Sequence, residues 1–333
     1  MRSVSVVVVV VALSGAVVAA CGGEDKPAAS SSGGSAARQT VTVKVAAGPF
    51  AAYAPLYVGI RQGIFAKHHL KVDPQPVVGG AEAVAGLVSG SFQFGSPDSV
   101  ATLTAASKGL PLRVLGLASQ GGETAKDDYS CLEVRDKSIT TPKQLEGKTV
   151  AVNVLGNIVT LSMKAALAKQ NVDVSKIKYL EIPVPEEPQA LQQGRVDAVS
   201  VTEPFCRAME ADGARSLSAT FADTTPRMLT GVWVTTQKYI KDHGDVARNF
   251  AAAIAEANAY SESHPEVVRE VVPTFTQIPT AVAKEMKLPS WTAKLDPSSV
   301  ALLDTLARRF DMYKKPVDTK ALVPDFVADG AGR

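Results

Sequence analysis

Two kinds of hydrophobic pattern alternate along most of the chain. Residues 40–46 (TVTVKVA) alternate β-branched and polar positions, which predicts a strand with one buried face. Residues 54–68 instead place Leu56, Ile60 and Ile64 on one face of a predicted helix. The same order of strand and helix continues further along the chain. Strands that alternate with helices in this way predict a parallel sheet covered by helices on both faces.

The alternation starts again in a second region and then gives way to helices. Strands are predicted in this region at residues 130–134, 148–153, 177–182 and 197–201. From Tyr239 onward, apolar residues recur mainly at helical spacing. The fold class is therefore α/β, with two α/β lobes and a helical C-terminal segment.

The chain is expected to cross twice between the two lobes. Residues 119–128 (SQGGETAKDD) are polar and rich in Gly, and a second crossing near 227–231 would return the chain to the first lobe. We therefore assign residues 40–122 and 232–333 to lobe 1 and residues 123–231 to lobe 2. Two crossings form a hinge about which two lobes can close around a ligand.

The N-terminal region has a different pattern from the rest of the chain. After a short basic start, residues 4–18 are almost purely aliphatic, which is too short for a membrane span of about 20 residues but typical of a signal peptide. We assign residues 1–20 to this signal peptide. Small residues directly before Cys21 resemble a bacterial lipobox, in which the cysteine is lipidated; the alternative is a plain secretory signal with an incidental cysteine. Residues 21–39, rich in Gly, Ser and Ala, are predicted to form a flexible tether.

Composition and charge exclude several classes of protein. With 46% hydrophobic and 20% charged residues, the chain is an ordinary globular protein rather than a collagen, a coiled coil or a disordered chain. A net charge of +2 gives no electrostatic reason to expect a nucleic-acid partner. Beyond Cys21 the cysteines are Cys131 and Cys206, which in an exported protein either form a disulfide or stay as two buried thiols. Cys and His do not show metal-ligand spacing, so neither a metal nor a cofactor is expected.

Three segments, in the same order, resemble motifs of one family. They are YAPLYV at 53–58 with GIF and LKV after it, LEGKTVAV at 145–152, and ALQQGRVDA at 190–198 followed by Glu203-Pro204. The sequence resembles the nitrate/sulfonate/taurine and thiamine-precursor (pyrimidine) binding proteins of ABC importers. It departs from them at His68-His69, where a Gly usually precedes the next Leu. Gly147 and Gly194 stand where a helix must turn into a strand, which favours the left-handed conformation.

The resemblance implies a fold, a role and partners. The fold would be that of type II periplasmic binding proteins, with the ligand in a cleft between the lobes. The role would be to capture a small polar solute outside the cytoplasm and deliver it to an ABC permease and its ATPase. The protein would be a monomer, held at the cell membrane by the lipid on Cys21.

The ligand-binding residues are predicted from the rule that ligands of open α/β sheets lie beyond the carboxyl ends of the strands. Four loops follow such strand ends, and their candidate side chains are Phe50, Tyr53, Ser96, Asp98, Ser99, Asn157 and Glu203. Alternatives remain for several of these residues. Asp98 and Ser99 are suited to capping a helix, Tyr53 to packing, and Glu203 to the first turn of a helix, where the dipole favours a carboxylate.

The charges of these loops bear on the ligand and on the kind of protein. Asp98 and Glu203 are carboxylates and the four loops hold neither Arg nor Lys, which favours a nitrogen-containing heterocycle or an amine over an anion. Sulfonate, nitrate or taurine binding is the alternative. Some pyrimidine-making relatives are enzymes, but they carry a Cys-rich run that this chain lacks, and the sequence has no GxSxG, Walker or GxGxxG motif. We therefore expect a binding protein rather than an enzyme, although a sensor or adhesion lipoprotein with the same cleft stays possible.

Overall fold

The computed structural model describes residues 39–276, 278–292 and 294–328. The predicted signal peptide, Cys21 and all but the last residue of the predicted tether lie outside the described residues, so these three expectations stay predictions. Within the described ranges, none of the helices has the length and apolar character needed to cross a membrane.

The first of two sheets combines four strands from the N-terminal part of the described chain with one strand that comes after the second sheet. Its order is β2-β1-β3-β10-β4, with strands β1 (Val41–Ala47), β2 (Leu70–Pro76), β3 (Phe94–Gly95), β4 (Leu112–Gln120) and β10 (Leu229–Thr236). β1 runs parallel to β2 and β3, whereas β10 runs antiparallel to β3 and β4. The sheet is therefore mixed: the predicted parallel pairing is present among β1, β2 and β3, and β10 departs from it. The antiparallel strand, β10, is the one that returns from the second sheet, whereas β1, β2 and β3 follow one another within the first sheet with helices between them.

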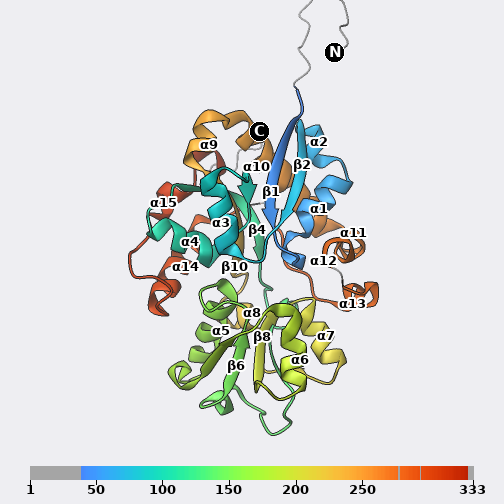
Figure 1. Cartoon of the computed structure of the whole chain (residues 1–333), viewed down its shortest axis with the longest axis vertical. Coiled ribbons are helices and arrows are strands. Elements are labelled where there is room, and N and C mark those ends of the chain that lie inside the picture. The colour runs from blue at the N-terminus through green and yellow to red at the C-terminus, as the bar shows by residue number, and fades with distance from the viewer. Residues whose placement is uncertain (1–38, 277, 293, 329–333) are drawn as a thin grey trace, which may run out of the picture. The chain divides into compact units, whose positions relative to one another are not determined.

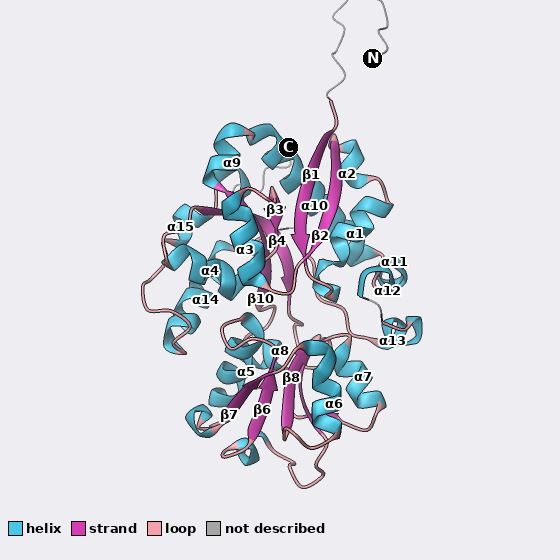
Figure 2. Ribbon diagram, viewed as in Figure 1, coloured by secondary structure: helices cyan, strands magenta, loops and turns pink. Residues whose placement is uncertain are grey.

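The second sheet has the same plan (Figure 2). Its order is β7-β6-β8-β5-β9, with strands β5 (Ser130–Val134), β6 (Thr149–Val152), β7 (Lys178–Glu181), β8 (Ala198–Thr202) and β9 (Arg215–Ser216). β6 is parallel to β7 and β8, and β5 is antiparallel to β8 and β9. The strand that enters this sheet directly from the first, β5, is again the antiparallel one.

Helices cover the sheets (Figure 1). Those around the first sheet are α1 (Ala54–Arg61), α2 (Ile64–Lys67), α3 (Gly80–Ser89), α4 (Ser99–Ser107), α9 (Gln237–Asp242), α10 (Gly244–Ser263), α11 (Pro265–Val271), α12 (Pro273–Thr276), α13 (Thr280–Glu285), α14 (Pro297–Arg309), α15 (Thr319–Leu322) and α16 (Asp325–Ala328). Those around the second sheet are α5 (Ile158–Lys169), α6 (Glu187–Gln192), α7 (Phe205–Ala211) and α8 (Thr220–Thr224). The single helix predicted over 54–68 is interrupted, because Gly63 adopts the left-handed conformation, with φ of 68°.

The apolar core of the first sheet lies on both of its faces. On one face α10 packs with α1, and the ring of Phe250 stacks on that of Phe94 with centroids 4.0 Å apart. On the other face, Leu103 of α4 and Val232 of β10 belong to a cluster that also includes Leu161 of α5. This second cluster joins the helices that cover the two sheets, so part of the core is shared between them.

The two crossings run side by side. They are shorter than predicted, since residues 119–120 end β4 and β10 already starts at Leu229. The N–H of Gly121 donates to the carbonyl of Met228 and the N–H of Arg227 to that of Gly122, each over 2.9 Å. This pairing ties the crossings into one two-stranded connection. The boundaries of the lobes themselves stay a prediction.

Candidate ligand-binding cleft

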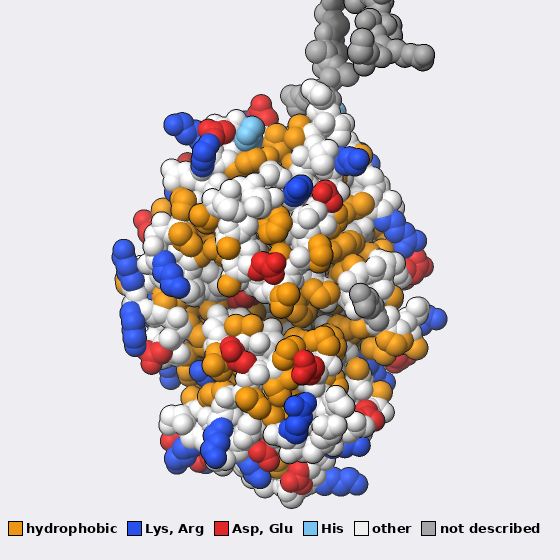
Figure 3. All heavy atoms as spheres, in the orientation of Figure 1, with side chains coloured by type: hydrophobic (Ala, Val, Ile, Leu, Met, Phe, Trp, Pro, Cys, Tyr) orange, Lys and Arg blue, Asp and Glu red, His pale blue; other side chains and the backbone are white. Residues whose placement is uncertain are grey.

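A cavity of about 800 Å³ lies between the two sheets and is lined from both of them. The first sheet's side supplies residues of α3, α4 and the loop after β1, and the second supplies Asn153, Val154, residues 156–159 and Thr202. On the face drawn in the space-filling view, hydrophobic side chains gather across the middle of the molecule (Figure 3). The volume is within the range of pockets that hold small organic ligands, roughly 300–1,000 Å³.

The cavity lies at the carboxyl ends of the inner strands. The loop with Phe50 follows β1, α4 follows β3, α5 follows β6, and Thr202 is the last residue of β8. This is where open α/β sheets place their ligands. Phe50, Tyr53, Asp98 and Asn157 line the cavity, so the structure brings four of the seven predicted side chains together.

Of these four side chains, Asp98 accepts the most hydrogen bonds from backbone N–H groups. Its Oδ1 accepts hydrogen bonds from the N–H groups of Val100 at 3.0 Å and Ala101 at 3.1 Å, which makes it the N-cap of α4. The same oxygen accepts a third bond, of 3.1 Å, from the N–H of Ile158, the first residue of α5. Burial raises the pKa of the Asp98 carboxyl to about 6, although these hydrogen bonds act in the opposite direction. The capping alternative is thus observed, together with a bond to the other side of the cleft.

Tyr53 and Asn157 are held by hydrogen bonds of their own. The Tyr53 hydroxyl donates to the carbonyl of Ser96 at 2.8 Å, and burial raises the pKa of this hydroxyl well above its ordinary value. Asn157 caps α5 by accepting from the N–H of Thr160 at 3.1 Å, and its amide donates to the side chain of Asn153 at 2.9 Å. These hydrogen bonds restrain the orientations of both side chains in the cavity wall.

The other three predicted residues lie outside the cavity lining. Ser96 is buried, and its backbone carbonyl accepts the hydrogen bond from the Tyr53 hydroxyl. Ser96 is connected to the site through this bond. The Ser99 hydroxyl donates to the carbonyl of Leu229 at 2.9 Å, which attaches the start of α4 to β10. Glu203 is also buried and is bound to backbone on two sides.

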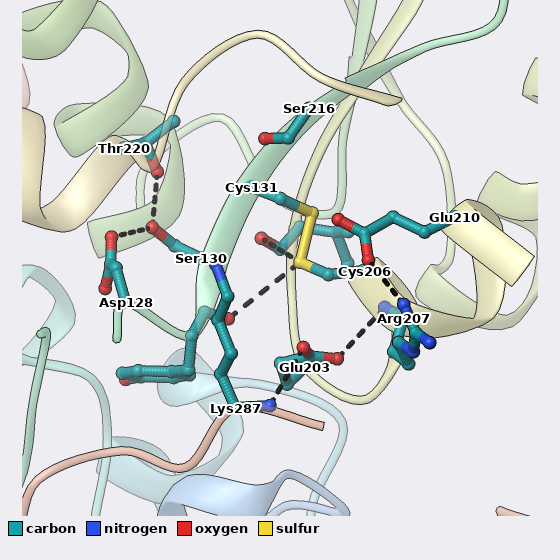
Figure 4. The surroundings of a disulfide bond; sticks show 12 residues. Asp128, Ser130, Cys131, Glu203, Cys206, Arg207, Glu210, Ser216, Thr220 and Lys287 are labelled. Atoms are coloured by element: carbon teal, nitrogen blue, oxygen red, sulfur yellow. Dashed lines mark hydrogen bonds and ion pairs between the residues drawn. A yellow bond between two sulfur atoms is a disulfide. The ribbon is translucent and has the colours of Figure 1, made fainter. Parts of the chain in front are cut away.

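The contacts of Glu203 connect the end of β8 in the second sheet to the C-terminal segment (Figure 4). Its Oε2 accepts from the N–H of Arg207 at 3.0 Å, and its Oε1 accepts from the N–H of Lys287 at 3.1 Å. Burial raises the pKa of the Glu203 carboxyl. Both oxygens are therefore engaged by backbone N–H groups outside the cavity.

A disulfide lies next to this carboxylate (Figure 4). It joins Cys131 of β5 to Cys206 of α7, which starts two residues after Glu203. Of the two alternatives for these cysteines, the structure contains the bonded one. The bond attaches α7 to β5 of the second sheet.

Among the polar side chains in the cavity wall that were not predicted, three are hydrogen-bonded to one another. Tyr129 donates to the Thr230 hydroxyl at 2.8 Å, and the Ser119 hydroxyl is hydrogen-bonded to the same atom at 2.8 Å. All three are on or beside the crossing strands β4, β5 and β10. The prediction considered only the loops that follow inner strands. The strands that connect the two sheets also reach the cleft, and attention to them could have found these three residues.

The described residues do not contain a group of three or more His, Cys, Asp or Glu side chains arranged to hold a metal ion. The polar part of the cavity wall consists mainly of hydroxyl and amide groups around the Asp98 carboxylate. Such a wall can hold a solute by hydrogen bonds and by the charge of Asp98, with Glu82 and Lys108 as the other charged residues of the lining.

Comparisons with known proteins agree with this architecture. Residues 51–267 match the family model described as NMT1/THI5 like. The taurine-binding periplasmic protein of Escherichia coli (strain K12) is 28% identical over 232 residues, which cover 69% of this chain and 70% of that protein.

Two solved structures show the same fold. The ligand-binding component of an ABC-type import system from Staphylococcus aureus has a TM-score of 0.75 at 17% identity, covering 88% of this chain and 99% of that one. The alkanesulfonate-binding protein of Xanthomonas axonopodis pv. citri has a TM-score of 0.73 at 18% identity, covering 86% of this chain and 99% of that one. The two mixed sheets, the double crossing and the matched segment lead to one conclusion: the chain is a member of the NMT1/THI5-like family and has the periplasmic-binding-protein fold.

Proposed function

We propose that the protein is an extracytoplasmic solute-binding protein that captures a small molecule in the cleft and delivers it to an ABC importer. The observation that carries this proposal is the cavity of about 800 Å³ lined by both sheets at the carboxyl ends of their strands. A relative named as a taurine-binding periplasmic protein and a structural neighbour named as a component of an ABC-type import system support it.

Binding is coupled to closure of the cleft. A solute that contacts Asp98 on one side and Asn157 or Thr202 on the other stabilises the conformation in which both sides are close. The paired crossings at Gly121–Met228 and Gly122–Arg227 supply the hinge. The closed form is the one that docks on the permease.

The protein's place in the cell follows from its N-terminal sequence. The signal peptide of residues 1–20 exports the chain, and lipidation of Cys21 anchors it to the membrane through the tether of residues 21–39. The body works as a monomer on the outer side of the cytoplasmic membrane.

The role is binding without catalysis. The cavity lining contains neither His nor Cys among the described residues, and the Ser119 hydroxyl is bonded to Thr230 rather than to a base. A hydroxyl without an adjacent base is a weak nucleophile.

We favour a ligand with a nitrogen donor, an amine or a heterocycle, because the Asp98 carboxylate lines the cavity where α4 and α5 begin. Sulfonate, nitrate or taurine binding is the second candidate. It is supported by the names of the taurine-binding relative and the alkanesulfonate-binding neighbour.

A thermal-shift screen over amines, pyrimidines, sulfonates, nitrate and aromatic acids tests the proposal, since a ligand of the native state raises the melting temperature. At least one class is expected to raise it, and Thr202→Val, which removes a hydroxyl from the cavity wall, should reduce the shift. Thr305→Val, on the exposed side of α14, is the matched control. A protein that none of these compounds stabilises, and that shows no compaction in small-angle scattering, would contradict the proposal.

A further inference from the structure

We call the part of the cavity where helices α4 and α5 begin its inner end; it is already occupied by a negative charge of the protein itself, that of Asp98. Helices α4 and α5 both begin there, and the first N–H groups of a helix carry partial positive charge that favours an anion. Oδ1 of Asp98 accepts bonds from Val100 and Ala101 on α4 and from Ile158 on α5. An anionic ligand would have to displace this carboxylate or lie against it.

The second oxygen of Asp98 faces a different environment. Oδ2 accepts no hydrogen bond from the described residues, and the nearby Gly80 leaves it uncovered, because a Cβ at that position would come within 3.0 Å of it. Asp98 is partly exposed and lines the cavity. A negatively charged acceptor without a partner favours a ligand that carries a hydrogen-bond donor.

The remaining polar groups near Asp98 are neutral. Burial raises the pKa of both the Tyr53 and the Tyr129 hydroxyl far above neutrality, so both stay protonated. Each hydroxyl donates within the protein, to Ser96 and to Thr230, and so has lone pairs left to accept a bond. The inner end of the cavity is therefore rich in acceptors.

From this end the cavity continues as an apolar groove between α3 and α4. We define the groove by its small and aliphatic lining residues, Ala81, Val84, Ala85, Val88, Ala101 and Ala105. On each helix these positions recur every three or four residues, so they form one face. At a rise of 1.5 Å per residue, the stretch from Ala81 to Val88 gives the groove a length of about 10 Å. Lys108 and Glu82 are the charged residues along its edge.

Apolar side chains at the groove are left uncovered by the protein. Val78 is 87% exposed and Val88 46% exposed, and both line the cavity. Exposed apolar groups that adjoin a cavity mark ligand-binding grooves. The groove starts at Asp98, so one molecule can occupy both regions.

We propose, on the basis of the solute-binding role above, that the ligand is amphipathic: a protonated amine or heterocyclic N–H binds Asp98 Oδ2, and an apolar body lies in the groove along α3 and α4. A two-carbon aminosulfonate would leave most of the groove empty. The ligand class is therefore an aryl or alkyl nitrogen compound with a body of about 10 Å, as the helical rise sets it.

Matched pairs of probes test the head group and the body separately. Phenylalkylamines and phenylalkylsulfonates with the same linkers, together with methylamine and taurine, are titrated calorimetrically at pH 7.5. The amines are expected to bind more tightly than their sulfonate partners. Their affinity is expected to rise about three- to fourfold for each added methylene until the groove is filled, the gain that burial of about 0.8 kcal/mol per methylene gives.

Two variants connect the result to the named residues. Asp98→Asn keeps an oxygen that can cap α4 and removes the charge, so amine affinity should fall at least tenfold while the fold is retained. Asp296→Asn is its control, since Asp296 caps α14 in the same way on the exposed surface. Ala85→Leu, at an exposed position in the groove, should weaken the long amines and leave methylamine unchanged.

The outcomes separate this inference from the proposed function. Sulfonates that bind as tightly as the amines, or amines that bind equally well to Asp98→Asn, would overturn the inference and leave solute binding intact. If short amines bind and a longer apolar body gives no gain in affinity, the proposed role of the groove would be wrong. Failure of every probe, while the thermal-shift screen finds another solute, would overturn the inference alone; failure of both experiments would remove the proposed function as well.

Discussion

Asp98 and Glu203 occupy comparable places in the two sheets. Each follows an inner strand, β3 or β8, and each lies near the start of a helix. Asp98 is partly buried and Glu203 is buried. Asp98 binds backbone N–H groups with one oxygen and leaves the other toward the cavity. Glu203 binds backbone N–H groups with both oxygens and lies outside the cavity.

The difference lies in what packs against each strand end. A glycine, Gly80, lies beside Asp98, whereas the backbone of Lys287 covers Glu203. A carboxylate at the same place in the two sheets thus keeps one oxygen without a protein partner at Asp98, where we propose a ligand contact, and forms a structural link at Glu203. This comparison predicts that changes near Glu203 affect stability and changes near Asp98 affect binding.

Removal of the Cys131–Cys206 disulfide is expected to have the largest effect on stability. The bond closes a loop between residues 75 apart, for which the entropy of the unfolded chain predicts a stabilisation of about 4 kcal/mol. Urea unfolding of the double Ser variant should show this loss, and a reducing agent should lower the midpoint of the natural protein alone. Binding per folded molecule should be retained, because neither cysteine lines the cavity. A variant that unfolds at the same urea concentration as the natural protein would contradict the expectation.

Glu203→Ala should come next, with a loss of about 3 kcal/mol. The substitution leaves the partly buried N–H groups of Arg207 and Lys287 without an acceptor, and each unsatisfied buried group costs about 1–3 kcal/mol. Glu203→Gln keeps one carbonyl acceptor and should lose less. Urea unfolding measures all three proteins, with Glu266→Ala on the exposed start of α11 as control. If Glu203→Ala were to abolish ligand binding without a change in stability, the assigned structural role would be wrong.

Local sequence signals predicted much of the fold. The two α/β regions and the returning strand came from hydrophobic periodicity and from Gly-rich polar stretches. Gly147 and Gly194 adopt φ values of 83° and 67°, which confirms the left-handed turns expected there. These features depend on residues that are near one another in the chain.

The division of roles between the two carboxylates depends on distant residues. Glu203 is covered by Lys287, which is 84 positions away, and no local pattern indicates that contact. The bond from Ile158 to Asp98 spans 60 positions in the same way. Thr230 was missed because it lies within a strand, where its apolar neighbours predict burial rather than a place in the cavity wall.

A third carboxyl group, that of Glu187, can be compared with these two. It is expected to make the stability of the fold depend on pH. It starts α6, is fully buried, and has no hydrogen-bond partner among the described residues. Burial raises the pKa of Glu187 from 4.5 to about 9. Between these two pH values the folded protein holds a proton that the unfolded chain releases, so the free energy of unfolding falls as pH rises.

Glu187→Gln keeps the shape of the side chain and removes this titration. Between pH 6 and pH 8 the free energy of unfolding should therefore fall less steeply than in the natural protein, by up to about 1.4 kcal/mol per pH unit. Glu133, whose pKa is raised by burial to about 8, keeps part of the slope in the variant. Glu186→Gln, at the exposed neighbouring position, should leave the slope unchanged. Equal slopes in Glu187→Gln and the natural protein would show that Glu187 is ionised in the fold.

Asp98 should instead make binding depend on pH, in a lower range. With a pKa of about 6, its carboxyl is mostly ionised at pH 7 and mostly protonated at pH 5. The affinity for a phenylalkylamine should therefore fall about tenfold between these pH values, because the amine stays charged while its partner becomes neutral. The groups that face Asp98 from neighbouring elements are Tyr53 and Tyr129, with Glu82 and Lys108 further along the same cavity.

Calorimetric titrations at half-unit pH steps measure this decline. The tyrosines stay protonated throughout the range, because burial raises the pKa of each hydroxyl. Asp98→Asn should bind weakly with no pH dependence, whereas Glu82→Gln should keep a midpoint near that of the natural protein. A midpoint that moves with Glu82→Gln, or that persists in Asp98→Asn, would assign the titration to another group. A decline near pH 6 that is lost only with Asp98 would identify this carboxylate as the one whose free oxygen binds the ligand, in contrast to Glu203, whose two oxygens are already engaged.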